Sequence, residues 1–342
     1  MSTPPPPVPP APGVAARLGA ALPPRYVARR LAGTAVLLLV LSAAVFALLQ
    51  LAPGDPARTL LGARGATPEA LAEVRARHHL DQPVLVQYGH WLGDLLRLDL
   101  GTSIRTGESV ASALGDRALL TCQLVGLGFA TALLLGLPLG VLAAFRERRP
   151  TDRAVQGLGV VTLSTPAFAS GLALIYVCAL MLGWFPAYGA GEGGLDRLRH
   201  LVLPAVTLGL AVMGVLLKLT RAAVVRELAR DHVTFARARG VGPRTVLFRY
   251  VLRGAAVQVT AGAALVLAYL LAGTVMVETV FALPGLGPLL VDSITFRDLP
   301  VVQAVALAVA TLVCLANLAA DLAQPLLDPR LRTPAPTPKA AP

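Results

Sequence analysis

The sequence has 342 residues, of which 55% are hydrophobic and only 14% are charged, and its mean hydropathy is +0.68. A soluble globular protein carries about 25% charged residues, so this composition excludes a soluble enzyme, a disordered chain and a secreted disulfide scaffold. It predicts an all-α integral membrane protein with several spans. The net charge of +11 would suggest nucleic acid on a soluble protein, but on a membrane protein the location of the charge matters more.

The first 30 residues are rich in proline and alanine, and we interpret residues 1–30 as a flexible tail. The apolar run that follows, residues 31–51, is longer than a signal-peptide core of about 7–15 residues. At about 1.5 Å per residue it can cross a bilayer, which favours a first transmembrane helix over a cleaved signal peptide. Five further spans are predicted at residues 118–144, 154–182, 203–220, 255–281 and 301–324. Six spans place both termini on the same side.

The polar segments between these spans form two sets of opposite charge balance. One set holds 20 basic and five acidic residues, and the other holds 10 basic and 12 acidic residues. The basic set comprises residues 1–30, 145–153, 218–253 and 325–342, and the other comprises residues 52–117, 183–202 and 282–300. Because arginine-rich segments stay inside, we expect both termini to be cytoplasmic and residues 52–111 to form an extracytoplasmic subdomain. The basic surplus then reflects topology, and no nucleic-acid partner is predicted.

The extracytoplasmic subdomain has helical stretches around residues 68–79 and 84–97. Its three histidines lack paired acids or cysteines, so we expect no metal site and no cofactor. In the second span, Gly136 and Gly140 have the G-x-x-x-G spacing that lets helices approach closely, and we interpret them as packing residues.

The chain carries no nucleotide-binding motif. Its only lysines are Lys218 and Lys339, and neither stands in the G-K-[ST] sequence of a phosphate-binding loop. If ATP drives this protein, another chain must bind it. The three cysteines, Cys122, Cys178 and Cys314, each lie in an apolar run and are interpreted as small buried hydrophobic residues.

The cytoplasmic segment 221–254 begins with helical spacing, is broken by Gly240, Gly242 and Pro243, and continues as a second short helix. A helix, a glycine turn and a helix can dock into a groove on a partner. The competing interpretation is a basic loop whose arginines only touch lipid head groups.

Among the polar residues inside predicted spans, Glu278, Asn317 and Asp321 stand out, and Gln123, Gln258 and Gln303 are weaker cases. Ionisable residues within a membrane favour a translocation path or a gate, and we predict that role for the first three. Glu278 is near the outer end of its span and Asp321 near the inner end of its own. Either could therefore cap a helix or pair with an arginine for a purely structural reason.

Several short motifs together resemble one family of transport proteins. Residues 236–240 read A-R-A-R-G, which resembles the A-R-A-K-G core of the cytoplasmic loop in permease subunits of ABC importers. The wider family motif begins E-A-A, and Thr234 and Phe235 stand where its glutamate and first alanine would be. Further motifs are P-G-D-P-A-R at 53–58, L-D-Q-P at 80–83, D-L-G-T-S at 99–103, V-E-T-V-F at 277–281, P-G-L-G at 284–287, R-D-L-P-V-V-Q at 297–303 and L-D-P-R-L-R at 327–332. Their order resembles the B-type permease subunit of dipeptide, oligopeptide and nickel ABC importers.

The resemblance implies a type I importer permease in a bacterial cytoplasmic membrane, with residues 112–324 as the permease domain and 325–342 as a cytoplasmic tail. Such subunits pair with a similar second permease, most often as a heterodimer, and with two ATP-binding subunits and an extracytoplasmic solute-binding protein. They move peptides or related solutes by alternating access and catalyse no reaction.

In such a permease the ATPase-coupling residues would be Thr234, Phe235, Ala236, Arg237, Ala238, Arg239 and Gly240. Gly240 would then allow a tight turn at positive φ. An ATP-independent secondary transporter or channel is the alternative function. Internal repeats or many intramembrane charges would favour it, and neither is evident. An intramembrane enzyme would need a motif such as H-E-x-x-H or G-x-S-x-G within the spans, and none is present.

Overall fold

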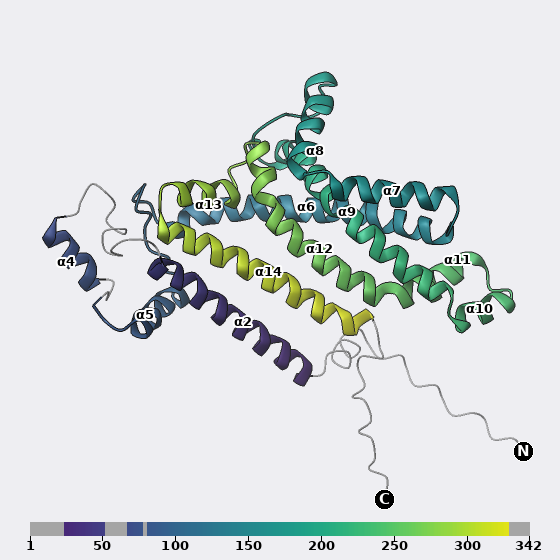
Figure 1. Ribbon diagram of the computed structural model, residues 1–342, viewed down its shortest axis with the longest axis horizontal. Helices are drawn as coiled ribbons and strands as arrows, with labels where there is room; N and C mark the ends of the chain where they lie inside the picture. The colour runs from purple at the N-terminus through teal and green to yellow at the C-terminus, as the bar shows by residue number, and fades with distance from the viewer. Residues whose placement is uncertain (1–23, 52–66, 78–80, 328–342) are drawn as a thin grey trace, which may run out of the picture.

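The computed structural model describes residues 24–51, 67–77 and 81–327, and those residues form a bundle of long helices (Figure 1). The predicted tails, as far as residue 23 and beyond residue 327, lie outside the described residues. So does the motif at 53–58. Apart from the helices, the described residues contain one isolated antiparallel bridge, between Thr102 and Ser109.

The helices follow one another as a first helix, a small helical subdomain and then the main bundle. They are α2 (Pro24–Leu51), α4 (Pro68–Arg77), α5 (Val84–Leu96), α6 (Val110–Phe145), α7 (Pro150–Ser164), α8 (Ala167–Leu174), the π-helix η1 (Ile175–Met181), α9 (Gly194–Leu228), α10 (Asp231–Ala238), α11 (Pro243–Thr245), the π-helix η2 (Val246–Val251), α12 (Leu252–Val280), α13 (Leu286–Thr295) and α14 (Leu299–Leu327). The two stretches predicted in the subdomain correspond to α4 and α5.

Five of the described helices are long and apolar enough to cross a membrane, and a bent pair supplies a sixth span if it is counted as one. The pair is α7 with α8 and η1, which turn by 102° at Thr165 and Pro166. Thr165 is extended, with ψ of 120°, as expected for a residue before proline. The predicted all-helical membrane fold is confirmed, and the third span is broken rather than straight.

Several helices extend beyond the predicted spans, because polar residues continue a helix past its apolar stretch. The first span begins at Pro24 rather than residue 31, so residues 24–30 of the expected flexible tail are helical. The fourth span, expected at residues 203–220, is part of the 35-residue helix α9. Hydropathy locates the part of a helix that can lie in lipid. The helix itself continues as long as its backbone N–H groups donate hydrogen bonds to carbonyl oxygens four residues earlier.

The segment 221–254, predicted to be cytoplasmic, also differs from its predicted structure at one end. Residues 243–251 are not a separate short helix but run into α12, so that Pro243–Val280 forms one continuous candidate span. Helix α13, in the connection after this span, was not predicted.

Helix α9 lies at the centre of the bundle and packs against α6, α7, α8 and α12. In its most apolar window 67% of the residues are buried, against 17% for α2. Gly140 of α6 allows one close approach, since a Cβ there would lie 2.8 Å from the carbonyl oxygen of Leu217. The interpretation of this glycine as a packing residue is confirmed.

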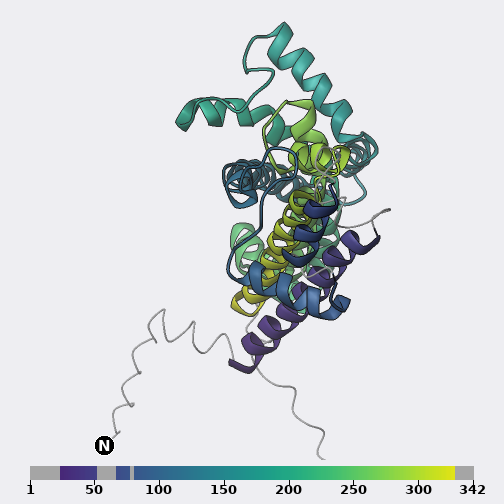
Figure 2. The ribbon, with the colours of Figure 1, turned by 90° about the vertical axis from the view of Figure 1, so that its left-hand side faces the viewer.

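The ends and the sides of the bundle carry different elements. Helices α10 and α11 lie at one end, and α5 and α13 lie at the other (Figure 1). Helix α2 lies on one side, packed against α14, while α7 and α8 lie on the opposite side (Figure 2). The predicted site residues lie in three separate regions of the bundle: the end with α10, the end with α13, and the side where α2 packs against α14.

Candidate functional site

Helix α10 is a short helix at one end of the bundle, where it packs against the end of α9 and against η2. Its Val233 and Ala236 are buried, and they pack with Val224 of α9 and with Val246 and Val251. One face of α10 is thus fixed to the ends of α9 and of the fifth span. Because packed side chains transmit displacement, a movement of α10 is coupled mechanically to both of these helices.

A buried carboxylate holds the start of α10 in place. Glu227, in the last turn of α9, has a side chain that is only 5% exposed. Its two oxygens lie 3.2 Å from Arg230 Nε and 3.1 Å from His232 Nε2. This contact joins the end of α9 to the first turn of α10, and sequence reasoning did not find it. The sequence signal that could have indicated this contact was a glutamate, Glu227, among the arginines of the basic segment.

Gly240 ends α10 with the backbone conformation that its sequence predicted. Its φ is +75°, in the left-handed region that favours glycine. The Gly240 N–H donates to the carbonyl oxygen of Arg237 at 2.9 Å, and the Val241 N–H donates to that of Ala236 at 3.1 Å. Left-handed residues with such bonds commonly terminate helices, and here the turn redirects the chain into Pro243.

The outer face of α10 combines an aromatic ring with positive charge. Phe235 is 68% exposed, and the other exposed residues of α10 and its C-terminal end are Asp231, His232, Thr234, Arg237, Ala238 and Arg239. A large aromatic residue left exposed among arginines is typical of the centre of a protein interface. Of the predicted coupling residues, Ala236 faces the bundle and the others are exposed.

Glu278 lies at the other end of the bundle and is completely buried. Its carboxylate accepts hydrogen bonds from Thr121 Oγ1 at 2.6 Å and from the Gly287 N–H at 2.7 Å. The Leu286 N–H in turn donates to Thr121 Oγ1 at 3.0 Å. A Cβ on Gly285 would collide with the Glu278 carboxyl group. The V-E-T-V-F and P-G-L-G motifs therefore meet as one lock that joins α12, α13 and α6.

A second pair of motifs meets close to this lock. The buried carboxylate of Asp298 accepts hydrogen bonds from Ser103 Oγ at 2.5 Å and from the Ile104 N–H at 3.1 Å. Ser103 belongs to the D-L-G-T-S motif, and Asp298 belongs to the R-D-L-P-V-V-Q motif. The contact fixes the segment before α6 to the connection between α13 and α14.

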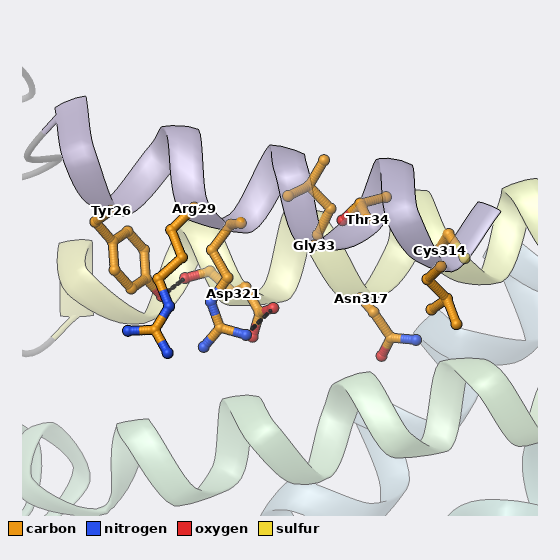
Figure 3. Close-up of a pocket in the computed structure, with 10 residues that line it drawn as sticks. Tyr26, Arg29, Gly33, Thr34, Cys314, Asn317 and Asp321 are labelled. Atoms are coloured by element: carbon orange, nitrogen blue, oxygen red, sulfur yellow. Dashed lines mark hydrogen bonds and ion pairs between the residues drawn. The ribbon is translucent and has the colours of Figure 1, made fainter. Parts of the chain in front are cut away.

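Asn317 and Asp321 line a groove between α2 and α14, and Glu278 is not among the residues that line it (Figure 3). Asp321 Oδ2 accepts a hydrogen bond from Arg30 Nη1 at 2.6 Å, and Tyr26 donates its hydroxyl to the Asp321 carbonyl oxygen at 2.9 Å. The three residues predicted for a path are thus not brought together. Glu278 and Asp321 have the structural partners that the alternative interpretation described, and their role in a path stays a prediction.

Comparisons with known proteins identify the wider group to which these features correspond. Residues 136–333 match the family described as binding-protein-dependent transport system inner membrane component, and residues 24–125 match the N-terminal family of the same membrane components. The glutathione transport system permease protein of Salmonella choleraesuis is 39% identical over 293 residues, 86% of this chain and 94% of that protein. A probable peptide ABC transporter permease of Sinorhizobium fredii is 36% identical over 310 residues, 90% of this chain and 99% of that protein.

A solved structure supports the fold. An inward-facing MetNI methionine ABC transporter chain matches with a TM-score of 0.51 and 18% identity, covering 62% of this chain and 95% of that one. At this identity the likeness concerns the arrangement of helices alone.

Proposed function

This chain belongs to the family of binding-protein-dependent transport system inner membrane components, and on that premise we propose that it carries glutathione or short peptides into the cell. It is a permease subunit of an ABC importer, a transport component rather than an enzyme, and the ATPase is a partner subunit. The relatives named for glutathione and for peptide transport support the proposed solute class.

The proposed assembly contains a second permease, two ATP-binding subunits and an extracytoplasmic solute-binding protein. The outer face of α10 is the observation that carries this proposal, because Phe235 and two arginines are exposed there while Val233 and Ala236 anchor the opposite face. Phe235 would enter an apolar pocket of an ATP-binding subunit, and Arg237 and Arg239 would pair with acids around it.

Such a contact explains how ATP energy reaches the membrane. Binding of ATP moves the ATP-binding subunits, α10 moves with them, and the Glu227 contact and the packed residues behind α10 pass the motion to α9 and α12. These two helices then rearrange between states open to opposite sides. The solute and ATP must bind the two states with different affinity for transport to result.

The solute class is tested with the complete complex in proteoliposomes, supplied with its binding protein and radiolabelled glutathione. We expect uptake that needs both ATP inside and binding protein outside, and that short peptides inhibit by competition. Inhibition by a sugar or a single amino acid but not by peptides would contradict the solute class. Uptake by this chain alone without ATP would favour a secondary transporter instead.

The proposed topology places α10 in the cytoplasm and α5 outside, in accordance with the arginine distribution. It is tested by replacing the three native cysteines with alanine and introducing Leu85→Cys or Phe235→Cys, two sites that are 84% and 68% exposed. In intact cells that express this chain without its ATP-binding subunits, so that position 235 is not covered by a partner, a membrane-impermeant maleimide should label position 85 and not 235. It should label 235 only after the membrane is opened, and the reverse pattern would overturn the topology.

A further inference from the structure

The groove between α2 and α14 has a volume of about 500 Å³ and changes character along its length (Figure 3). One end is lined by Tyr26, Arg29, Arg30 and Asp321. The other end is lined by smaller or apolar side chains, namely Gly33, Thr34, Leu37, Cys314 and Leu318, with Asn317 between the two ends. The groove therefore has a charged mouth and a mainly apolar body, as an amphiphilic ligand requires.

The charge at the mouth is positive once its internal ion pair is counted. Arg30 and Asp321 neutralise one another across the groove at 2.6 Å. Arg29 is exposed and forms no ion pair with any described side chain, and Arg25, also exposed, stands one helical turn before it. Two guanidinium groups at this spacing lie on one face of α2 and can bind a phosphate group through paired N–H donors.

The groove as a whole, from its charged mouth to the end of its apolar body, has the right length for a head group and the first part of an acyl chain. The lining residues of α2 from Arg29 through Gly33 to Leu37 share one face of the helix. Eight residues of helix rise about 12 Å, which compares with roughly 15 Å for half of a hydrocarbon core. A Cβ placed on Gly33 would have no atom of the described residues within 4 Å, so within that part of the chain the groove is open at this point.

We propose that this groove binds one anionic phospholipid of the cytoplasmic leaflet, with the phosphate on Arg29 and Arg25 and an acyl chain along Gly33 and Leu37. The depth of the site rests on the proposed orientation, in which the start of α2 is cytoplasmic. The surroundings favour a lipid over a soluble anion, because the neighbouring surface of α2 exposes the large apolar side chains of Leu31, Val36, Leu39 and Val40. A bound lipid would fasten the otherwise thinly packed α2 to α14.

The proposal is tested on the membrane complex purified through this chain in mild detergent, by native mass spectrometry with added phosphatidylglycerol or, for comparison, phosphatidylcholine. We expect phosphatidylglycerol to be retained selectively. Arg29→Gln should weaken its binding at least tenfold, the size expected for losing a charge-assisted bidentate contact. Gly33→Leu should weaken it as well, by filling the body of the groove without altering any charge.

Arg146→Gln is the matched control. Arg146 is an exposed arginine that follows α6, it forms no ion pair with a described side chain, and it lies outside the groove. This variant should bind phosphatidylglycerol as the unmodified complex does. Equal binding of both lipids, or unchanged binding in Arg29→Gln and Gly33→Leu with an intact complex, would overturn the proposal. So would efficient cross-linking of Gly33→Cys to the second permease or to this chain's own tails, since protein would then cover the groove.

This test does not depend on transport. Retained phosphatidylglycerol together with failed glutathione and peptide uptake would reject the solute class and leave the lipid site standing. Normal uptake with no selective lipid binding would do the reverse.

Discussion

Replacing Gly240 with proline is expected to abolish solute-stimulated ATP hydrolysis while the chain still inserts and assembles in the membrane. Gly240 has φ of +75°, whereas the proline ring holds φ near −65°. Proline also removes the N–H that donates to the Arg237 carbonyl oxygen. The turn must therefore rearrange, and the exposed face that carries Phe235 is turned away from its partner. We expect stimulated hydrolysis to fall at least tenfold, measured with the purified complex and its binding protein.

A neighbouring glycine provides the control for this prediction. Gly242 has φ of −59°, a value that proline adopts without strain, so Gly242→Pro should retain most of the stimulated activity. Gly240→Ala should fall between the two, because alanine tolerates a left-handed conformation at a cost of about 1–2 kcal/mol. If Gly240→Pro couples ATP hydrolysis to solute as well as Gly242→Pro does, the turn has no role in coupling.

The second large effect is expected at the opposite end of the bundle, where Glu278→Ala should destabilise the complex strongly. The substitution removes a completely buried side chain and leaves the Thr121 hydroxyl and the Gly287 N–H without their acceptor. Each orphaned buried donor costs about 1–3 kcal/mol, and the cavity adds to it, so a loss of about 3 kcal/mol or more is expected. For a chain of 342 residues, with an unfolding entropy of about 2.1 cal/mol/K per residue, that corresponds to a fall of roughly 4 °C or more in melting temperature.

Thr279→Ala is the matched control for Glu278→Ala. Thr279 is the next residue, is exposed, and bonds only within its own helix, to the Val275 carbonyl oxygen. Its replacement should leave the melting temperature within about 1 °C, since surface substitutions usually change stability by less than about 0.5 kcal/mol. Both variants are compared by thermal unfolding of the purified complex in detergent. A melting temperature for Glu278→Ala equal to that of Thr279→Ala would show that the lock between α12, α13 and α6 contributes little.

Much of the fold could be predicted because a membrane restricts the possible structures. Long apolar runs must be helical in lipid, so hydropathy located the spans even where their ends were misplaced. Gly240 could be predicted as a turn because its neighbours carry helical spacing and a proline follows three residues later. The ordered motifs identified the family, although their physical role was visible only in the structure, where Glu278 and Asp298 each join two motifs.

The remaining features depend on contacts between distant residues. The approach of Arg30 to Asp321 and of Thr121 to Glu278 joins segments more than 150 residues apart, and one sequence contains no signal for such a pair. Residues 243–251 were separated from the fifth span because their arginines lower the hydropathy, yet arginine is a good helix former. Polar residues in a span predicted a path; the structure shows the burial and hydrogen bonds of Glu278, and its role in a path stays a prediction.

The most direct test of the coupling role is a cross-link from Phe235. A photoreactive benzoylphenylalanine is placed at Phe235, which is 68% exposed on α10, and in a second sample at Phe168 of α8, which is 48% exposed. After illumination of the assembled complex, the adduct formed from position 235 should contain the ATP-binding subunit, and the adduct from position 168 should not. Adducts of position 235 with lipid alone, in a complex that hydrolyses ATP, would contradict the proposed docking of α10.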